Sequence, residues 1–139
     1  MIEDKLKTQD YLHKHIPVSK AMAVRIEHLD TAMVTLYAPL EPNINHRGTV
    51  FGGSASAVAI LAAWTLVHYR LHQGGKSYRL VIQKNSISYQ QPIHSGFRAE
   101  CRMDDKKWKT FAQTLSRRKR ARISLQVNLQ SKDKTVGVF

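Results

Sequence analysis

The sequence predicts an α+β fold in which an antiparallel sheet wraps around one long central helix. Residues 54–72 are apolar on nearly every side and are followed by Gly74 and Gly75, a pattern typical of a helix enclosed by other structure. Segments before and after it alternate apolar and polar residues, as strands with one buried face do. The 139 residues, 42% of them apolar and 23% charged, suit one globular domain over residues 1–139.

The predicted elements follow one another without a repeat or a linker. A weak helical spacing of Ile2, Leu6 and Leu12 predicts a short helix before Pro17. Alternation predicts strands at 22–27, 31–38, 79–89, 96–103, 123–130 and 135–139. A short amphipathic helix is expected where apolar residues recur at helical spacing, at Trp108, Phe111, Ala112 and Leu115. The last strand is expected to be short or truncated, and the open edge and face of such a sheet predict a homodimer.

Cysteine content and hydropathy restrict the class of protein. The single cysteine, Cys101, excludes an intramolecular disulfide, and its alternation with Phe97, Ala99 and Met103 predicts a buried structural thiol. The N-terminus has acidic residues and no apolar run, so it does not match a secretory signal. The longest apolar stretch, 55–67, is shorter than the roughly 20 residues of a membrane span. We therefore expect a cytoplasmic protein with no membrane partner.

The loop before the predicted long helix carries the most specific motif. It reads Asn43-Ile-Asn45-His-Arg-Gly48-Thr-Val-Phe-Gly52-Gly53-Ser. Together with the helix, it resembles the hot-dog thioesterase superfamily, in which an Asn-x-x-Gly-x-x-[His/Phe]-Gly-Gly loop leads into the central helix. The LAAW and Trp-x-x-Phe patterns further along are similar to the group of the YiiD C-terminal domain, which includes malonyl-acyl-carrier-protein decarboxylases. The resemblance covers roughly residues 21–139 and implies the hot-dog fold and a thioester substrate.

Two glycines at the helix start are the expected substrate-binding groups. Gly52 and Gly53 let a ligand approach the backbone closely, and the first amides of a helix lack internal partners and favour negative charge. A thioester oxygen that gains charge during the reaction suits such a site. The alternative is that the glycines only allow tight packing of the helix. Ser54 is expected to cap the helix or to add a hydrogen bond to the substrate.

Asn45 is the expected catalytic residue. A side-chain amide can donate a hydrogen bond to an oxygen without titrating. In the resembled family the Asn of the Asn-x-x-Gly unit contacts the thioester, and the spacing to Gly48 selects Asn45 rather than Asn43. The alternative is a turn residue. His46, beside it, is a possible acid or base and equally a solvated loop residue.

The helix lacks the base that a hydrolase needs. Many hot-dog hydrolases use an Asp or Glu on this helix, whereas residues 51–67 contain no Asp, Glu, His, Lys or Cys. His68 and His72 have the spacing of metal ligands on a helix, but no third ligand is evident, so we expect no metal and no cofactor. Decarboxylation of a malonyl thioester needs no such base, because the carboxylate leaves once the enolate oxygen is stabilised.

The formal net charge of +12 favours an acidic partner. The densest cationic run is Arg117-Arg118-Lys119-Arg120, with Arg122 after it. Such a run is usually solvated; as a functional surface it suits an acidic acyl carrier protein or the phosphates of coenzyme A. Interleaved aromatic residues and a nucleic-acid-binding motif are absent, so no nucleic-acid partner is expected.

These observations lead to one hypothesis and two alternatives. The leading hypothesis is a malonyl-acyl-carrier-protein decarboxylase that yields acetyl-acyl-carrier-protein and carbon dioxide for the initiation of fatty-acid synthesis, acting on the malonyl thioester of the carrier or of coenzyme A. The second is an acyl-CoA or acyl-carrier-protein thioesterase. The third is a non-catalytic module that binds acyl carriers or nucleic acid.

Overall fold

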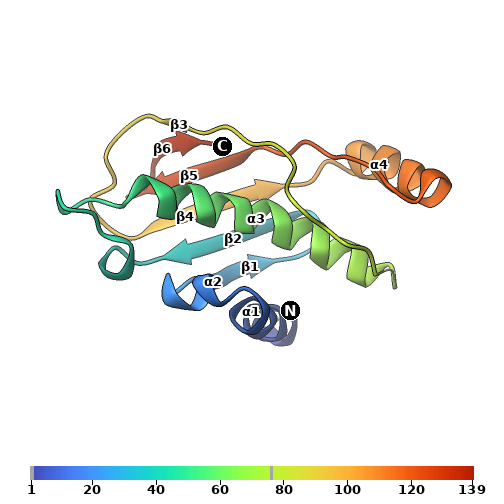
Figure 1. Ribbon diagram of the computed structural model, residues 1–139, viewed down its shortest axis with the longest axis horizontal. Helices are drawn as coiled ribbons and strands as arrows, with labels where there is room; N and C mark the ends of the chain where they lie inside the picture. Colours follow the sequence, from blue (N-terminus) through green and yellow to red (C-terminus); the bar gives the residue numbers. More distant parts are fainter. Residues whose placement is uncertain (1, 76) are drawn as a thin grey trace.

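A computed structural model describes residues 2–75 and 77–139 and has the predicted α+β architecture. The helices are α1 (Ile2–His15), α2 (Pro17–Ala21), the 3-10 turn η1 (Glu41–Asn43), α3 (Gly52–Gln73) and α4 (Asp105–Arg118). The strands are β1 (Arg25–Leu29), β2 (Met33–Ala38), β3 (Ser88–Tyr89), β4 (Phe97–Arg102), β5 (Val127–Ser131) and β6 (Lys134–Val138). They form one antiparallel sheet in the order β1-β2-β4-β5-β6-β3, with α3 lying along one face (Figure 1). This is the hot-dog fold that the resemblance implied.

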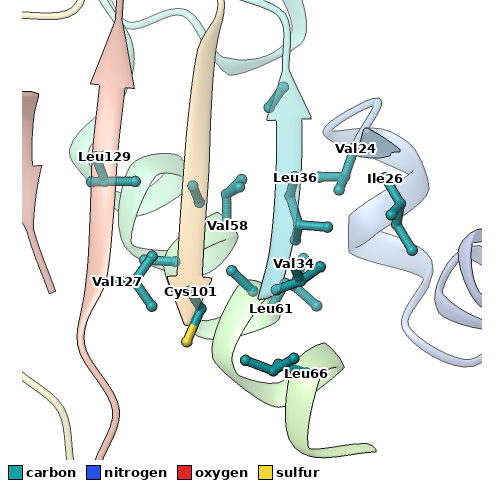
Figure 2. Close-up of a cluster of buried hydrophobic side chains, with 14 of the residues drawn as sticks. Val24, Ile26, Val34, Leu36, Val58, Leu61, Leu66, Cys101, Val127 and Leu129 are labelled. Carbon is teal, nitrogen blue, oxygen red and sulfur yellow. The ribbon is translucent and has the colours of Figure 1, made fainter. Parts of the chain in front are cut away.

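The core lies between α3 and the central strands. In register, Leu36 of β2 is opposite Ala99 of β4, which is opposite Leu129 of β5. All three are fully buried, because alternate side chains of each strand point to the same face of the sheet. Figure 2 shows these strands meeting Val58 and Leu61 of α3. The period-two pattern in the sequence therefore identified the buried face correctly.

The central helix is covered on one side more than on the other. Residues such as Val58 and Ala62 are buried against the sheet, whereas Ile60 and Ala57 remain partly exposed. The chain after α3 crosses back over the helix, and the indole nitrogen of Trp64 donates to the carbonyl of Leu80 at 3.0 Å (Figure 1). The prediction of a helix enclosed on every side is therefore wrong for a single chain.

The strand predicted at 79–89 is the largest correction. Only Ser88 and Tyr89 form a strand, paired with β6, and residues 77–87 have no regular secondary structure. After α3 this segment crosses the helix, where the carbonyl of Leu80 accepts from Trp64, and it joins the edge of the sheet only at β3 (Figure 1). Val81 and Ile82 are 71% and 47% exposed. A sequence with the alternation of a strand thus lies outside the hydrogen-bonded ladder of the sheet.

Smaller differences occur at element ends. The predicted strand at 22–27 begins only at Arg25, because Met22 closes α2 and Ala23 has a positive φ of 56°. The strand predicted at 123–130 begins at Val127, since its partner β4 ends at Arg102 and leaves 123–126 without a ladder. The short helix α2 was not predicted; Pro17 at its first position suits a helix start. Within the described residues, none of the helices has the length and apolar content of a membrane span.

Cys101 is the buried thiol that its alternation predicted. It lies on β4 with no exposed surface, and burial raises the pKa of the thiol to about 12. Because the thiolate is the reactive form, we expect native protein at pH 8 to leave a chromogenic disulfide reagent unreduced, and urea-unfolded protein to release one equivalent of chromophore. Rapid reaction of the native protein would show that Cys101 is accessible.

Candidate active site at the start of the central helix

A depression of about 350 Å³ lies beside the first turn of α3. Its wall is formed by residues from the loop, the helix and the segment after β3: Val50, Gly52, Ala55, Tyr89, Gln90, Gln91, Pro92 and Ile93. The hydroxyl of Tyr89 donates to the carbonyl of Gly52 at 2.7 Å and joins the edge of the sheet to the helix start. Two segments that are 37 residues apart thus build one site.

Free backbone amides point out of the start of α3. The N-cap residue is Phe51, and its carbonyl accepts from the amides of Ser54 and Ala55 at 3.0 and 3.2 Å. Among the described residues, the preceding amides, those of Gly52 and Gly53, have no hydrogen-bond partner. Because the positive end of the helix dipole lies at the same place, these two donors suit an oxygen that carries negative charge.

The two glycines are also required by space. A Cβ on Gly52 would lie 3.2 Å from the Tyr89 hydroxyl, and a Cβ on Gly53 would collide with the ring of Phe51. Neither glycine has a positive φ. Their absence of a side chain therefore keeps the helix start open to a ligand, and the conformational freedom of glycine plays no part.

Asn45 lies in the loop, outside the wall of the depression. Its Oδ1 accepts from the amides of Arg47 and Thr49 at 2.9 and 3.1 Å, and its Nδ2 donates to Thr49 Oγ1 at 2.9 Å. The side chain thereby closes the turn that ends at Gly48, whose φ is 77°. The turn role weighed as the alternative is observed. A contact with the substrate requires Nδ2 to exchange its bond with Thr49 for one with a thioester oxygen, so the catalytic role stays a prediction.

Asn43 holds the base of the loop. It is 2% exposed, and its Nδ2 donates to the carbonyls of Met22 and Pro39 at 2.9 and 2.8 Å. Its own carbonyl accepts from the amide of Phe51 at 2.7 Å, so Asn43 fixes the residue that begins α3. These bonds give Asn43 a structural role.

The other residues singled out in the sequence are placed as follows. Ser54 is the third residue of α3, so the expectation that it caps the helix is wrong; its side chain is partly exposed beside the glycines. His46 is exposed in the loop. His68 and His72 stack on each other at 5.3 Å, and His68 stacks on Trp64 at 4.6 Å. Within residues 2–75 and 77–139, no group of three or more His, Cys, Asp or Glu side chains is arranged to hold a metal.

Tyr89, Gln90 and Gln91 were missed by the sequence interpretation. Tyr89 ends the short strand β3, and Gln90 and Gln91 follow it; together they supply a hydroxyl and two amides to the depression. No local motif marks them, because they meet Gly52 only through the pairing of β3 with β6. Like Asn45, they are neutral hydrogen-bonding groups.

The family model described as "Putative thioesterase (yiiD_Cterm)" matches residues 5–139, which is nearly the whole chain. The chain belongs to this thioesterase family. The resemblance to the YiiD C-terminal group is thereby confirmed at the level of the family.

Solved structures of similar proteins support the same fold. A Chlorobaculum tepidum protein "with unknown function" is 28% identical, with a TM-score of 0.89 over 96% of this chain and 88% of that chain. A Shewanella oneidensis protein described as a "putative thioesterase" is 26% identical, with a TM-score of 0.88 over 99% and 94%. A Pseudomonas aeruginosa "Probable Thioesterase" is 20% identical, with a TM-score of 0.83 over 94% and 87%, and shows the shared fold alone.

Proposed function

We propose that this member of the thioesterase family decarboxylates a malonyl thioester carried by an acyl carrier protein, leaving the acetyl thioester and releasing carbon dioxide. The observation that carries the proposal is the chemistry of the depression at the start of α3. Its wall contains neutral hydrogen-bonding groups, namely the hydroxyl of Tyr89, which donates to Gly52, the side-chain amides of Gln90 and Gln91, and the helix-start amides; among the described residues no Asp, Glu or His lines it.

Decarboxylation of a malonyl thioester suits a site with neutral hydrogen-bond donors. The electrons of the breaking carbon–carbon bond move into the thioester and form an enolate, whose oxygen the amides of Gly52 and Gly53 stabilise; water then supplies the proton that completes the acetyl group. A fixed donor at such an oxygen contributes about 2.7–4 kcal/mol. Two donors acting together would accelerate the reaction by about 10⁴–10⁶. The charge therefore develops where the free amides lie.

Hydrolysis of an acyl thioester is the second candidate, and the description of the family favours it. Water attack requires a general base to take a proton. The described residues that line the depression in one chain include no general base, so a hydrolase would have to recruit a carboxylate from a second subunit. The product of the reaction separates the two activities.

We extend the proposal to a homodimer built through the open edge of the sheet. The edge strand β3 pairs on one side with β6, and the segment before it carries the exposed side chains of Val81 and Ile82. Phe51 and Tyr89, beside the site, are 57% and 52% exposed. A second copy related by a two-fold axis would pair its own edge segment antiparallel to this one, cover these apolar side chains and complete the cover of α3.

The deciding assay uses malonyl-acyl-carrier-protein as the substrate and mass spectrometry of the carrier as the readout. We expect acetyl-carrier to accumulate. Free carrier thiol would show hydrolysis, and unchanged substrate would show a binding module; either result would overturn the decarboxylase. Gly52→Val places a side chain against Tyr89 at the helix start, so acetyl-carrier should form at least tenfold more slowly, and the melting temperature of the variant separates this loss from a loss of folding.

A further inference from the structure

The helix α4 and the segment after it carry the densest cluster of positive charge in the chain. Residues 104–122 contain eight cationic side chains and two carboxylates, in a chain whose total net charge is +12. The cations are exposed on α4 and on the segment after it: Lys106, Lys107, Lys109, Arg117, Arg118, Lys119, Arg120 and Arg122. We refer to these eight residues as the α4 cationic surface.

Neither carboxylate is free to neutralise that surface. Asp104 is the N-cap of α4 and accepts from the amide of Lys106 at 2.9 Å, and Asp105 pairs with Arg70 of α3 at 2.7 Å. Among the described residues, none of the eight cations is in a salt bridge. The repulsion between these charges is therefore left for an external anionic group to relieve.

Part of the surface is anchored to the rest of the fold. Phe111 and Leu115 are buried side chains of α4, and Arg70 lies over the ring of Trp108 at 5.0 Å while it pairs with Asp105. Five of the eight cations lie on α4, which is about 21 Å long for its 14 residues at 1.5 Å per residue. Lys119, Arg120 and Arg122 follow its end, where Lys119 closes the helix with a φ of 62°.

We propose that the α4 cationic surface docks the acidic carrier protein that brings the thioester to the active site. This inference rests on the proposed function. The length of the surface favours a protein over coenzyme A, because the phosphates of one small molecule form a compact group and cannot pair with cations spread over about 20 Å. Nucleic acid is disfavoured because the aromatic rings of α4 are occupied: Phe111 is buried and Trp108 is half-buried under Arg70, which leaves no ring on α4 for base stacking.

The position of the surface determines what it does. It lies at the end of the sheet opposite the start of α3 (Figure 1), and α3 alone spans about 33 Å. Its cations therefore act on binding and have no contact with the reacting atoms of their own subunit. In the two-fold dimer proposed above, the antiparallel edges bring α4 of one subunit to the end of the sheet where α3 of the other begins, so a docked carrier faces the partner's site.

A shallow groove connects the surface to the sheet edge. One depression between α4 and the following segment includes Lys106, Lys107 and Arg122, and a second includes Lys107 and Ser88. Lys107 belongs to both, and its Nζ donates to the carbonyl of Ser124 at 2.7 Å. The two depressions therefore extend from the cations to Ser88, whose neighbour in β3, Tyr89, lines the depression at the active site.

The test compares two double charge reversals of equal size. Arg118→Glu/Arg120→Glu changes the α4 cationic surface, and Lys14→Glu/Lys20→Glu changes exposed cations of the N-terminal helices. For malonyl-carrier, the first variant should raise KM roughly tenfold with kcat unchanged, because charges at the rim of an interface act on association. The second variant should behave as the wild type. Raising the ionic strength to about 1 M, where the Debye length is about 3 Å, should bring the wild type's KM close to that of the first variant.

Two further substrates identify the partner. A malonyl thioester of N-acetylcysteamine, which has no phosphate and no carrier, should be turned over equally by all three proteins. An equal rise in KM for malonyl-CoA and malonyl-carrier in the first variant would overturn protein docking in favour of phosphate binding. Unchanged KM for malonyl-carrier, or the same loss in the Lys14/Lys20 control, would also overturn it.

A direct binding measurement separates this inference from the proposed function. Fluorescence anisotropy of a labelled carrier protein reports docking even if no substrate reacts. We expect wild type and control to bind the carrier and Arg118→Glu/Arg120→Glu to bind at least tenfold more weakly. Equal binding by all three proteins, or displacement of the carrier by a short RNA at equimolar concentration, would refute the assignment.

Discussion

Replacement of Asn45 by Ala is expected to lower kcat for malonyl-carrier by about 10²–10³, the loss that follows removal of one oxygen-stabilising donor. The side-chain amide of Asn45 donates to Thr49 Oγ1 at 2.9 Å, and a thioester oxygen could take the place of this hydroxyl as the acceptor. The rate of acetyl-carrier formation at saturating substrate checks this expectation. Full activity of the variant would remove Asn45 from the catalytic group.

Thr49→Val is the matched control, because Asn45 also closes its own turn. This substitution removes the hydroxyl that accepts from Asn45 Nδ2 and leaves Nδ2 with its longer bond to the carbonyl of Val50 at 3.4 Å, while the amides of Arg47 and Thr49 still donate to Oδ1. If Asn45 donates to the substrate, Thr49→Val keeps most of the activity. If Thr49→Val loses as much as Asn45→Ala, then Asn45 acts only by shaping the loop. Melting temperatures of both variants separate these effects from a loss of folding.

Phe97→Ala is expected to lower the free energy of unfolding by about 3–5 kcal/mol, as truncation of a buried aromatic ring does. Phe97 is fully buried at the start of β4, opposite Ala38 of β2. A loss of this size is a large part of the roughly 5–15 kcal/mol that stabilises a domain. Urea unfolding of the variant should show a lower midpoint with an unchanged slope.

Val18→Ala is the control for the Phe97 substitution. Val18 lies on α2 and is 55% exposed, so its truncation should change the free energy of unfolding by less than about 0.5 kcal/mol. Similar losses in the two variants would contradict the assignment of the core between α3 and the central strands.

Local sequence patterns predicted an element and its buried face correctly where the same chain supplies the neighbouring element against which it packs. The alternation at Val34, Leu36 and Ala38 predicted β2 and its buried face, and the spacing of Phe111 and Leu115 predicted α4 and its buried face. These predictions hold because a pattern of period 2 or 3.6 is set by the backbone of one element. The same logic failed at 79–87, where the pattern of a strand is present but the segment crosses α3, and only Ser88 and Tyr89 join the sheet.

The candidate site likewise contains some residues that the sequence predicted and others that it did not. The loop motif with Asn45, Gly52 and Gly53 was visible in the sequence, because a glycine pair before an apolar helix is a local signal. Tyr89 and Gln91 were not, because their place beside Gly52 depends on the pairing of β3 with β6. The sequence left two roles open for Asn45, substrate contact and turn residue, and its bonds to Thr49 and to the amide of Arg47 show the second, while the first stays a prediction.

The sequence by itself determined the fold class, the buried thiol of Cys101, the absence of an acid on residues 51–67 and the concentration of cations at 117–122. Each of these is a property of composition or of period within a single segment. Only the tertiary structure decided which neutral groups share the depression with Gly52, and that α4 lies at the far end of α3 from it. Those facts depend on strand register and on the direction in which a helix leaves the sheet, and both are set by contacts between residues far apart in the chain.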